Sequence, residues 1–189
     1  MAEKQKKQAQ EYTAFLRNQI DTSDSTIEEI SEKIGITPSS IHHWFRSDDF
    51  RLSRLVLVSN AMGCDLQIAV AKKPYQLKGE NPVFLSFAEM ERLKLKKMYF
   101  LKAAMKDAGF TKVALAEKLG VTVPALTYWY TTDDITIKRL VACAEAMGRD
   151  LYLRVVRDDS ATYQEEGTGI HMEVVKTRSW NVVDAISKR

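Results

Sequence analysis

Cysteine is scarce in this chain of 189 residues, which has only Cys64 and Cys143. Two cysteines are too few for a disulfide framework, and we expect no bridge between them. In the internal repeat described below, Cys143 aligns with Val58, which predicts a small, buried apolar side chain. Cys64 aligns with Arg149, which predicts an exposed turn.

Long apolar runs and a large excess of one charge are also missing. No run is long enough to span a bilayer, and the charged segment 1–10 is not followed by the apolar core of a signal peptide. We therefore expect a cytoplasmic protein without a membrane segment. A net charge of +3 is compatible with modest affinity for nucleic acid and is far from that of a histone-like protein.

The usual signatures of catalysis are absent as well. The sequence has no phosphate-cradling glycine loop, no metal signature and no nucleophile elbow. The acidic pairs at 158–159 and 165–166 have no partner base or nucleophile, which indicates a solvated loop. His42 and His43 are adjacent, point in different directions on a helix and are followed by no third ligand, which argues against a metal site. We expect neither an enzyme nor a cofactor.

What the chain does contain is one segment that occurs twice. Residues 28–37 recur as 113–122, and with the same offset of 85 and no gap Trp44 matches Trp129 and Gly63 matches Gly148. A repeat fixes the architecture before any single element is assigned. This one predicts two copies of a small helical module of roughly 70 residues, close to the lower limit for independent folding.

Pro74, Gly79 and Pro82 mark a linker between the copies. We expect the following domains: a first module with a trailing strand at 1–73, the linker at 74–85, a second module with a trailing strand at 86–157, and a C-terminal piece at 158–189. Apolar spacing and capping signals predict helices at 11–20, 26–35, 37–45, 52–63, 86–105, 112–119, 123–130 and 137–147.

Period-two alternation predicts strands at 65–71, 150–157 and 171–177, and the last should pair antiparallel with 151–156. A polar loop at 158–169 and a short helix at 181–188 complete the expected fold. The fold class is therefore mainly α, with a small sheet that ties the two helical modules together. A free edge of this sheet is a candidate contact for a second copy of the chain.

Each copy carries apolar residues on both sides of a glycine, as in Ile30, Ile34, Gly35, Ile36, Ile41 and Trp44. The glycine turns the chain sharply between two short helices that bury their apolar faces together. Trp44 and Trp129 are expected to anchor the core. The pattern resembles the helix-turn-helix of the lambda-repressor-like (Cro/C1-type) DNA-binding family over residues 11–65 and 94–150.

In that family the second helix of the motif lies in the major groove, so the resemblance implies a transcriptional regulator that binds double-stranded DNA. Carried over by position, the DNA-facing residues are Thr37, Pro38, Ser39, Ser40, His42, His43 and Arg46 in copy one. In copy two they are Lys112, Thr122, Val123, Pro124, Thr127, Tyr128 and Thr131. Serine hydroxyls and His43 suit base edges, Arg46 suits phosphate, and apolar groups of copy two suit thymine methyls.

Two features leave alternatives open. Acidic pairs follow both recognition helices, at 48–49 and 133–134; they either cap the next helix or repel a nearby phosphate. A lysine-rich face over 94–106 is either a track for phosphates or a solvated surface. The acidic loops and the apolar face of copy two support another function, a protein-interaction scaffold or a toxin-neutralising regulator with a degenerate motif.

Overall fold

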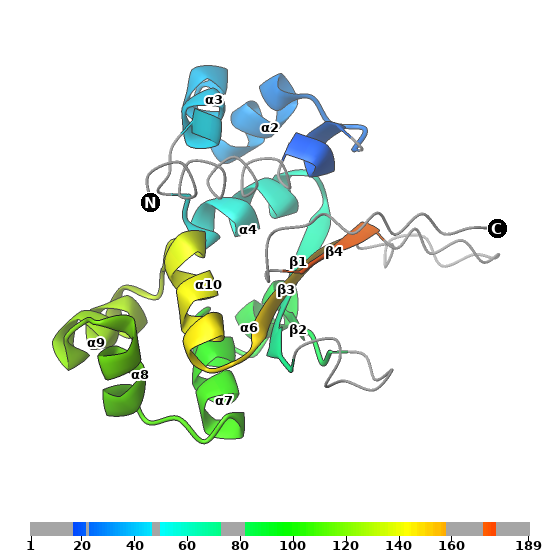
Figure 1. Cartoon of the computed structure of the whole chain (residues 1–189). Coiled ribbons are helices and arrows are strands. Elements are labelled where there is room, and N and C mark those ends of the chain that lie inside the picture. The colour runs from blue at the N-terminus through cyan, green and yellow to red at the C-terminus, as the bar shows by residue number, and fades with distance from the viewer. Residues whose placement is uncertain (1–16, 22, 47–49, 73–81, 158–171, 177–189) are drawn as a thin grey trace, which may run out of the picture.

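The computed structural model describes residues 17–21, 23–46, 50–72, 82–157 and 172–176. The first copy contains α2 (Ile27–Ile34), α3 (Pro38–Arg46), α4 (Leu52–Ala61) and β1 (Cys64–Ala71). The second repeats this order with α8 (Lys112–Leu119), α9 (Val123–Thr132), α10 (Ile137–Ala146) and β3 (Asp150–Arg157). The other elements are β2 (Leu85–Ser86), α6 (Phe87–Arg92), α7 (Tyr99–Asp107) and β4 (Met172–Lys176) (Figure 1).

Helix α2 begins and ends, and helix α3 begins, at the residues predicted from the capping signals. The backbone amide of Glu29 donates to Thr26 Oγ1 at 3.2 Å, and the amide of Thr26 donates to Glu29 Oε2 at 2.9 Å. This capping box satisfies amides that have no partner inside α2. Gly35 ends α2 in the left-handed region at φ 77°, a conformation that costs glycine little. Pro38 opens α3, as predicted.

The single helix predicted over 86–105 is wrong. α6 ends at Arg92, Lys94 adopts φ 54°, and α7 begins only at Tyr99. The cause is a contact distant in sequence: the carboxylate of Asp133 accepts the backbone amides of Lys97 and Met98, both at 2.9 Å. This carboxylate stabilises the start of a new helix, so a tertiary contact overrides the local helical spacing.

The strands form one antiparallel sheet of four, in the order β2-β1-β3-β4. The predicted small sheet and the pairing of β4 with β3 are confirmed. Leu85, the last residue of the predicted linker, and Ser86 pair with Ile68 and Gln67 of β1 as strand β2, which was not predicted from the sequence. The expected loop at 158–169 and helix at 181–188 lie outside the described residues.

The two copies are related by an approximate twofold axis within one chain. Ile68 of β1 faces Leu153 of β3, and Arg51 forms an isolated antiparallel bridge with Thr136; both pairs differ by 85, the offset of the repeat. The bridge is flanked by two matching hydrogen bonds, from Leu52 N to the Ile135 carbonyl and from Ile137 N to the Phe50 carbonyl, each 2.9 Å. Equivalent residues of the copies therefore contact each other, as they do in a symmetric dimer.

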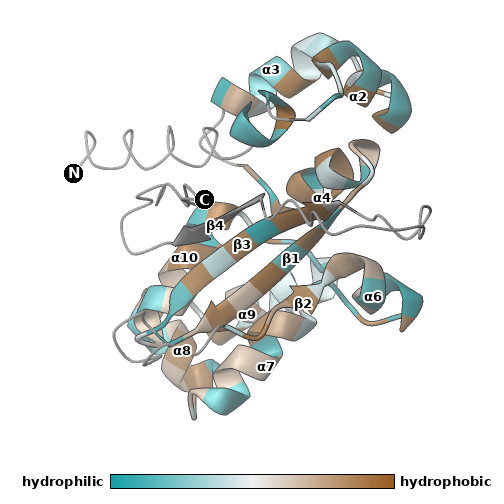
Figure 2. Cartoon of the chain, turned by 90° about the vertical axis from the view of Figure 1, so that its right-hand side faces the viewer, coloured by the Kyte–Doolittle hydropathy of each residue, from teal (hydrophilic) through white to brown (hydrophobic). Residues whose placement is uncertain are grey.

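The core lies between the sheet and the helices, with α4, α6 and α7 against β1 and α10 against β3. Figure 2 looks onto the sheet, with α7 and α9 behind it. Cys143 is buried, as predicted, but Cys64 is buried too and the expected exposed turn is wrong. Cys64 is the first residue of β1 and alternates with the buried Leu66 and Ile68, so its thiol faces the core. The two cysteines are not joined by a disulfide.

Candidate nucleic-acid interface

The corner between α2 and α3 positions the first candidate recognition helix. After Gly35, the amide of Ile36 donates to the Ser31 carbonyl at 3.0 Å. Ser31 is buried at the crossing of the helices, where its hydroxyl donates to the Glu28 carbonyl at 2.8 Å. In copy two Ala116 is buried at the same place. A small residue at this position lets the two helices approach closely.

The residues predicted to read DNA from copy one lie on the outer side of α3. Exposed positions are Thr37, Ser39, His42, His43 and Arg46, and half-exposed positions are Pro38 and Ser40. The side-chain oxygens of Thr37 and Ser40 lie 3.0 Å apart and share a hydrogen bond. Ile41 and Phe45 are buried on the opposite side and anchor the helix. The exposed face thus presents hydroxyl, imidazole and guanidinium groups.

The equivalent face of α9 has a different chemical character. Thr122, Pro124, Thr127, Tyr128 and Thr131 are exposed and Val123 is half-exposed. Tyr128 is 65% exposed, whereas the hydroxyl of Thr131 donates to the Thr127 carbonyl at 3.0 Å. Lys112 lies apart from this face, because its Nζ is 5.1 Å from the centre of the Tyr130 ring. Copy two therefore presents apolar and hydroxyl groups and no cation on α9 itself.

The acidic pair that follows α9, Asp133 and Asp134, caps helices. It does not cap α10, the next helix, which was one of the two alternatives considered above. Asp133 accepts two amides at the start of α7, and Asp134 accepts the Ser53 amide at 3.1 Å and the Ser53 hydroxyl at 2.9 Å, which caps α4 of the other copy. The next helix, α10, is capped by Thr136. Arg51 lies 3.3 Å from Asp134, and Lys97 lies 3.9 Å from Asp133. These cations offset the charge that would repel a phosphate. The pair at 48–49 lies outside the described residues.

Two arginines beside the recognition helices were missed from the sequence. Arg54 of α4 lies over the ring of Trp44 at 5.1 Å, and Arg139 of α10 lies over the ring of Trp129 at 5.4 Å. The two pairs are equivalent under the repeat, so the offset of 85 applied to basic residues would have found them. Trp129 is buried and Trp44 half-buried against the core, which supports the predicted anchoring role.

The approximate twofold axis places α3 and α9 at opposite ends of the molecule, with α4 and α10 between them (Figure 1). No helix in the described part of the chain has both the length and the apolar character needed to cross a membrane. Within the same residues, no three histidine, cysteine or acidic side chains gather as a metal site would require.

Comparison with known proteins agrees with this geometry. A family model described as helix-turn-helix matches the chain twice, at residues 16–68 and 101–153. No curated protein and no solved structure matches. Each match spans a complete α2–α3–α4 or α8–α9–α10 unit and ends within the strand that follows. The chain belongs to the lambda-repressor-like helix-turn-helix family of DNA-binding proteins and carries two tandem copies of its domain.

Proposed function

We propose that this protein is a transcriptional regulator whose two recognition helices, α3 and α9, bind successive major grooves of one DNA site. Dimers of helix-turn-helix proteins place two such helices about 34 Å apart, one turn of B-DNA. Here the approximate twofold axis through the Arg51–Thr136 bridge relates the two copies within a single chain. This internal symmetry is the observation that carries the proposal.

The differences between the two faces favour an asymmetric DNA site. On α3, His43 suits a guanine edge and Arg46 suits a phosphate. On α9, Val123 and Pro124 suit thymine methyls, and Thr127 and Tyr128 suit phosphates. Arg54 and Arg139, on the helices that follow, are further candidates for phosphate contact on each side. The two copies are related by an approximate twofold axis, but α3 and α9 carry different side chains. We therefore expect the protein to prefer a site with two different half-sites over a palindrome.

The test is fluorescence-anisotropy binding to duplex DNA over a series of salt concentrations. We expect affinity to fall steeply with salt, because bound phosphates release counterions. Arg46→Ala combined with His43→Ala should weaken binding by at least about tenfold and lower the salt slope by about 1. Arg92→Ala is the matched control, since Arg92 is an exposed arginine of α6 that pairs with Glu89 of the same helix. The reading face is wrong if the double variant binds like this control.

Site selection from a random duplex library then tests the asymmetry. The selected site should contain two different half-sites with centres about 10 base pairs apart. Duplexes that repeat either half-site as a palindrome should bind more weakly than the selected one. Tighter binding to a palindrome would mean that the two copies read the same sequence, contrary to the proposal.

Protein docking on copy two is the second candidate function, and a specific surface favours it. Tyr128 and Val113 are 65% and 63% exposed. A hollow of about 380 Å³ that reaches Tyr128 is lined by Leu119, Val121, Ala125, Tyr128, Trp129, Arg139 and Ala142. Tyr128→Ala should leave DNA affinity unchanged if this surface serves a protein partner, and should weaken it if the tyrosine contacts the DNA backbone.

A further inference from the structure

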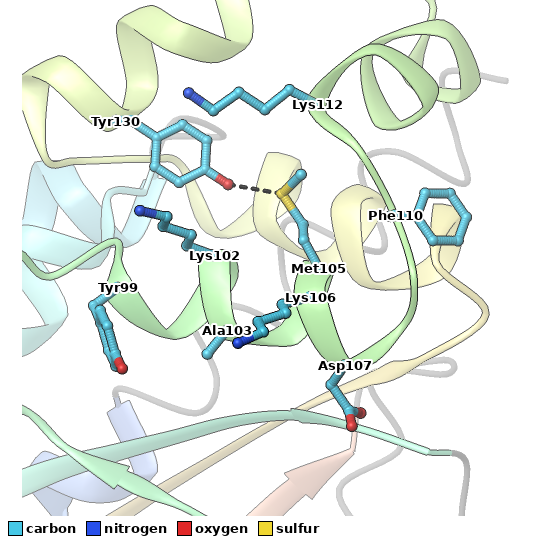
Figure 3. A pocket seen from close by; sticks show the side chains of 9 residues that line it. All are labelled: Tyr99, Lys102, Ala103, Met105, Lys106, Asp107, Phe110, Lys112 and Tyr130. Atoms are coloured by element: carbon cyan, nitrogen blue, oxygen red, sulfur yellow. Dashed lines mark hydrogen bonds between the residues drawn. The ribbon is translucent and has the colours of Figure 1, made fainter.

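A second hollow, of about 960 Å³, opens between α7, the start of α8 and the end of α9. Small-molecule pockets in proteins typically have volumes of about 300–1,000 Å³. Aromatic and apolar side chains form much of its wall: Tyr99, Ala103, Met105, Phe110 and Tyr130 (Figure 3). Such a wall favours a flat, apolar ligand body.

The rest of this wall is positively charged. Lys102 and Lys106 extend from α7, and Lys112 extends from α8 with its Nζ 5.1 Å from the Tyr130 ring centre (Figure 3). Asp107 is the acidic residue of the lining, and its carboxylate lies 2.8 Å from the guanidinium of Arg149. Because Arg149 offsets that charge, the three ammonium groups leave a surplus of positive charge at the hollow.

The first copy shows that the helix-turn-helix fold does not require these residues. At the positions of Lys112 and Tyr130 the first copy has Ile27 and Phe45. Phe45 is buried and Ile27 packs against the core, and Arg17, at the position of Lys102, lies over the Phe45 ring at 5.0 Å. Copy one therefore shares one cation of this region but has apolar side chains at the positions of Lys112 and Tyr130. A purely structural role for the region would be met by the same apolar pair. Lys112 and the Tyr130 hydroxyl are features of copy two that copy one lacks at the equivalent positions.

The hydroxyl of Tyr130 remains a hydrogen-bond donor at all physiological pH values. It donates to the sulfur of Met105 at 2.9 Å. Burial, with a smaller contribution from Cys143, raises the pKa of Tyr130 well above its ordinary value. Tyr130 therefore adds an aromatic face, and no negative charge, to a hollow already rich in cations.

We propose that this hollow binds a small organic anion with a flat apolar body. Its carboxylate, sulfonate or phosphate group lies among Lys102, Lys106 and Lys112, and its ring system packs against Tyr130. A bound anion of this kind contacts both helices of the second helix-turn-helix, because Lys112 begins α8 and Tyr130 belongs to α9. An effect of the anion on DNA affinity follows only if the proposed DNA-binding function is correct.

The probe for the first test is 1-anilinonaphthalene-8-sulfonate, whose fluorescence rises in an apolar site. Its matched neutral control is N-phenyl-1-naphthylamine, which has the same rings without the sulfonate. We expect saturable binding of the sulfonate by the intact protein and at least tenfold weaker binding by Lys106→Gln/Lys112→Gln. Lys138→Gln, an exposed lysine of α10 outside the hollow, should change nothing. Binding of the neutral probe should be the same in all variants.

Ala103→Trp, which adds a large side chain to the wall, should abolish sulfonate binding while circular dichroism shows an intact fold. The proposal is overturned if the sulfonate does not bind, or if the lysine variant binds it as tightly as the wild type does. The titration uses no DNA, so a positive result stands even if DNA binding fails. Repeating it in the presence of duplex DNA tests the regulatory effect separately, with a shift in DNA affinity of at least threefold expected.

Discussion

The buried thiol of Cys143 makes the unfolding free energy depend on pH. Burial raises the pKa of Cys143 to about 12, whereas an unfolded thiol titrates near about 8.5. The raised pKa means that the folded state keeps its proton while the unfolded state loses it. The stability linked to this group is therefore complete below about pH 8.5 and is lost as pH rises toward 12.

Cys143→Val should reduce this alkaline loss. Valine is the residue that copy one has at this position, Val58, where it is fully buried. Above about pH 9, the unfolding free energy of the wild type should fall faster than that of the variant, by up to about 1.4 kcal/mol per pH unit. Urea unfolding at pH 8, 9.5 and 10.5 measures the difference. The contribution of Tyr152 is the same in both proteins. Loss of Cys143 also removes its small contribution to the raised pKa of Tyr130, which acts in the predicted direction; parallel curves would contradict the prediction.

Residue-level inference from the sequence succeeded where the copies agree and failed where they differ. Trp129 and Cys143 are buried as predicted because the corresponding residues occupy the same places in the core. The prediction for Cys64 failed because it assumed that a position occupied by an arginine in the other copy, Arg149, must be exposed. β1 begins at Cys64, but β3 begins one residue after Arg149. Both positions nevertheless lie in line with the buried side of their strands, because Cys64 alternates with Leu66 and Arg149 with Leu151. The Arg149 side chain is itself only 12% exposed and pairs with Asp107, so an arginine in the repeat did not mark an exposed position.

At the scale of helices, two residues other than glycine adopt left-handed conformations in the described part of the chain. They are Lys94 at φ 54° and Asp133 at φ 53°. Lys94 follows α6 and its side chain is exposed, whereas the Asp133 carboxylate accepts two amides of the chain that leads into α7. Side-chain hydrogen bonds therefore offset the strain of the left-handed backbone at Asp133, whereas the side chain of Lys94 does not.

Substituting glycine should have opposite effects at these two positions. Lys94→Gly removes the strain and should raise the unfolding free energy by up to about 1 kcal/mol. Asp133→Gly also removes strain but leaves the start of α7 without its cap, and should lower the unfolding free energy by about 1–2 kcal/mol. Denaturant unfolding of both variants beside the wild type measures the signs. Two changes of the same sign would refute this account of the break between α6 and α7.

The same break marks the limit of predicting elements from sequence. Helices with signals inside their own span, such as Thr26 with Glu29 or Thr37 with Pro38, were predicted to within a residue or two. The break at Lys94 depends on Asp133, which lies some forty residues further along the chain, and apolar spacing over 93–105 carries no trace of it. The side-chain directions on α3 and α9 followed from helical geometry, but the turn of Lys112 toward Tyr130 did not.

At the scale of the whole molecule, the repeat predicted two copies of one module, and in the structure equivalent residues of the copies contact each other as in a dimer. The sequence could not supply the strand order, because pairing of β1 with β3 is set by how the two helical units pack. It also could not reveal that α4, which has no side-chain cap of its own, is capped by Asp134 of the other copy. The two modules are thus halves of one structure.

This dependence predicts that the first module does not fold alone. Without residues 74–189, the fragment 1–73 loses the β3 partner of β1, the Asp134 cap and the bond from Leu52 to Ile135. We expect the monomeric fragment to show no cooperative thermal transition in circular dichroism, and an equimolar mixture with fragment 74–189 to recover one. Intact protein cut only within the linker at 74–81 is the matched control and should keep the native transition. A folded, monomeric fragment 1–73 at micromolar concentration would mean that the modules are independent, and the twofold contact would then be an association of two stable domains.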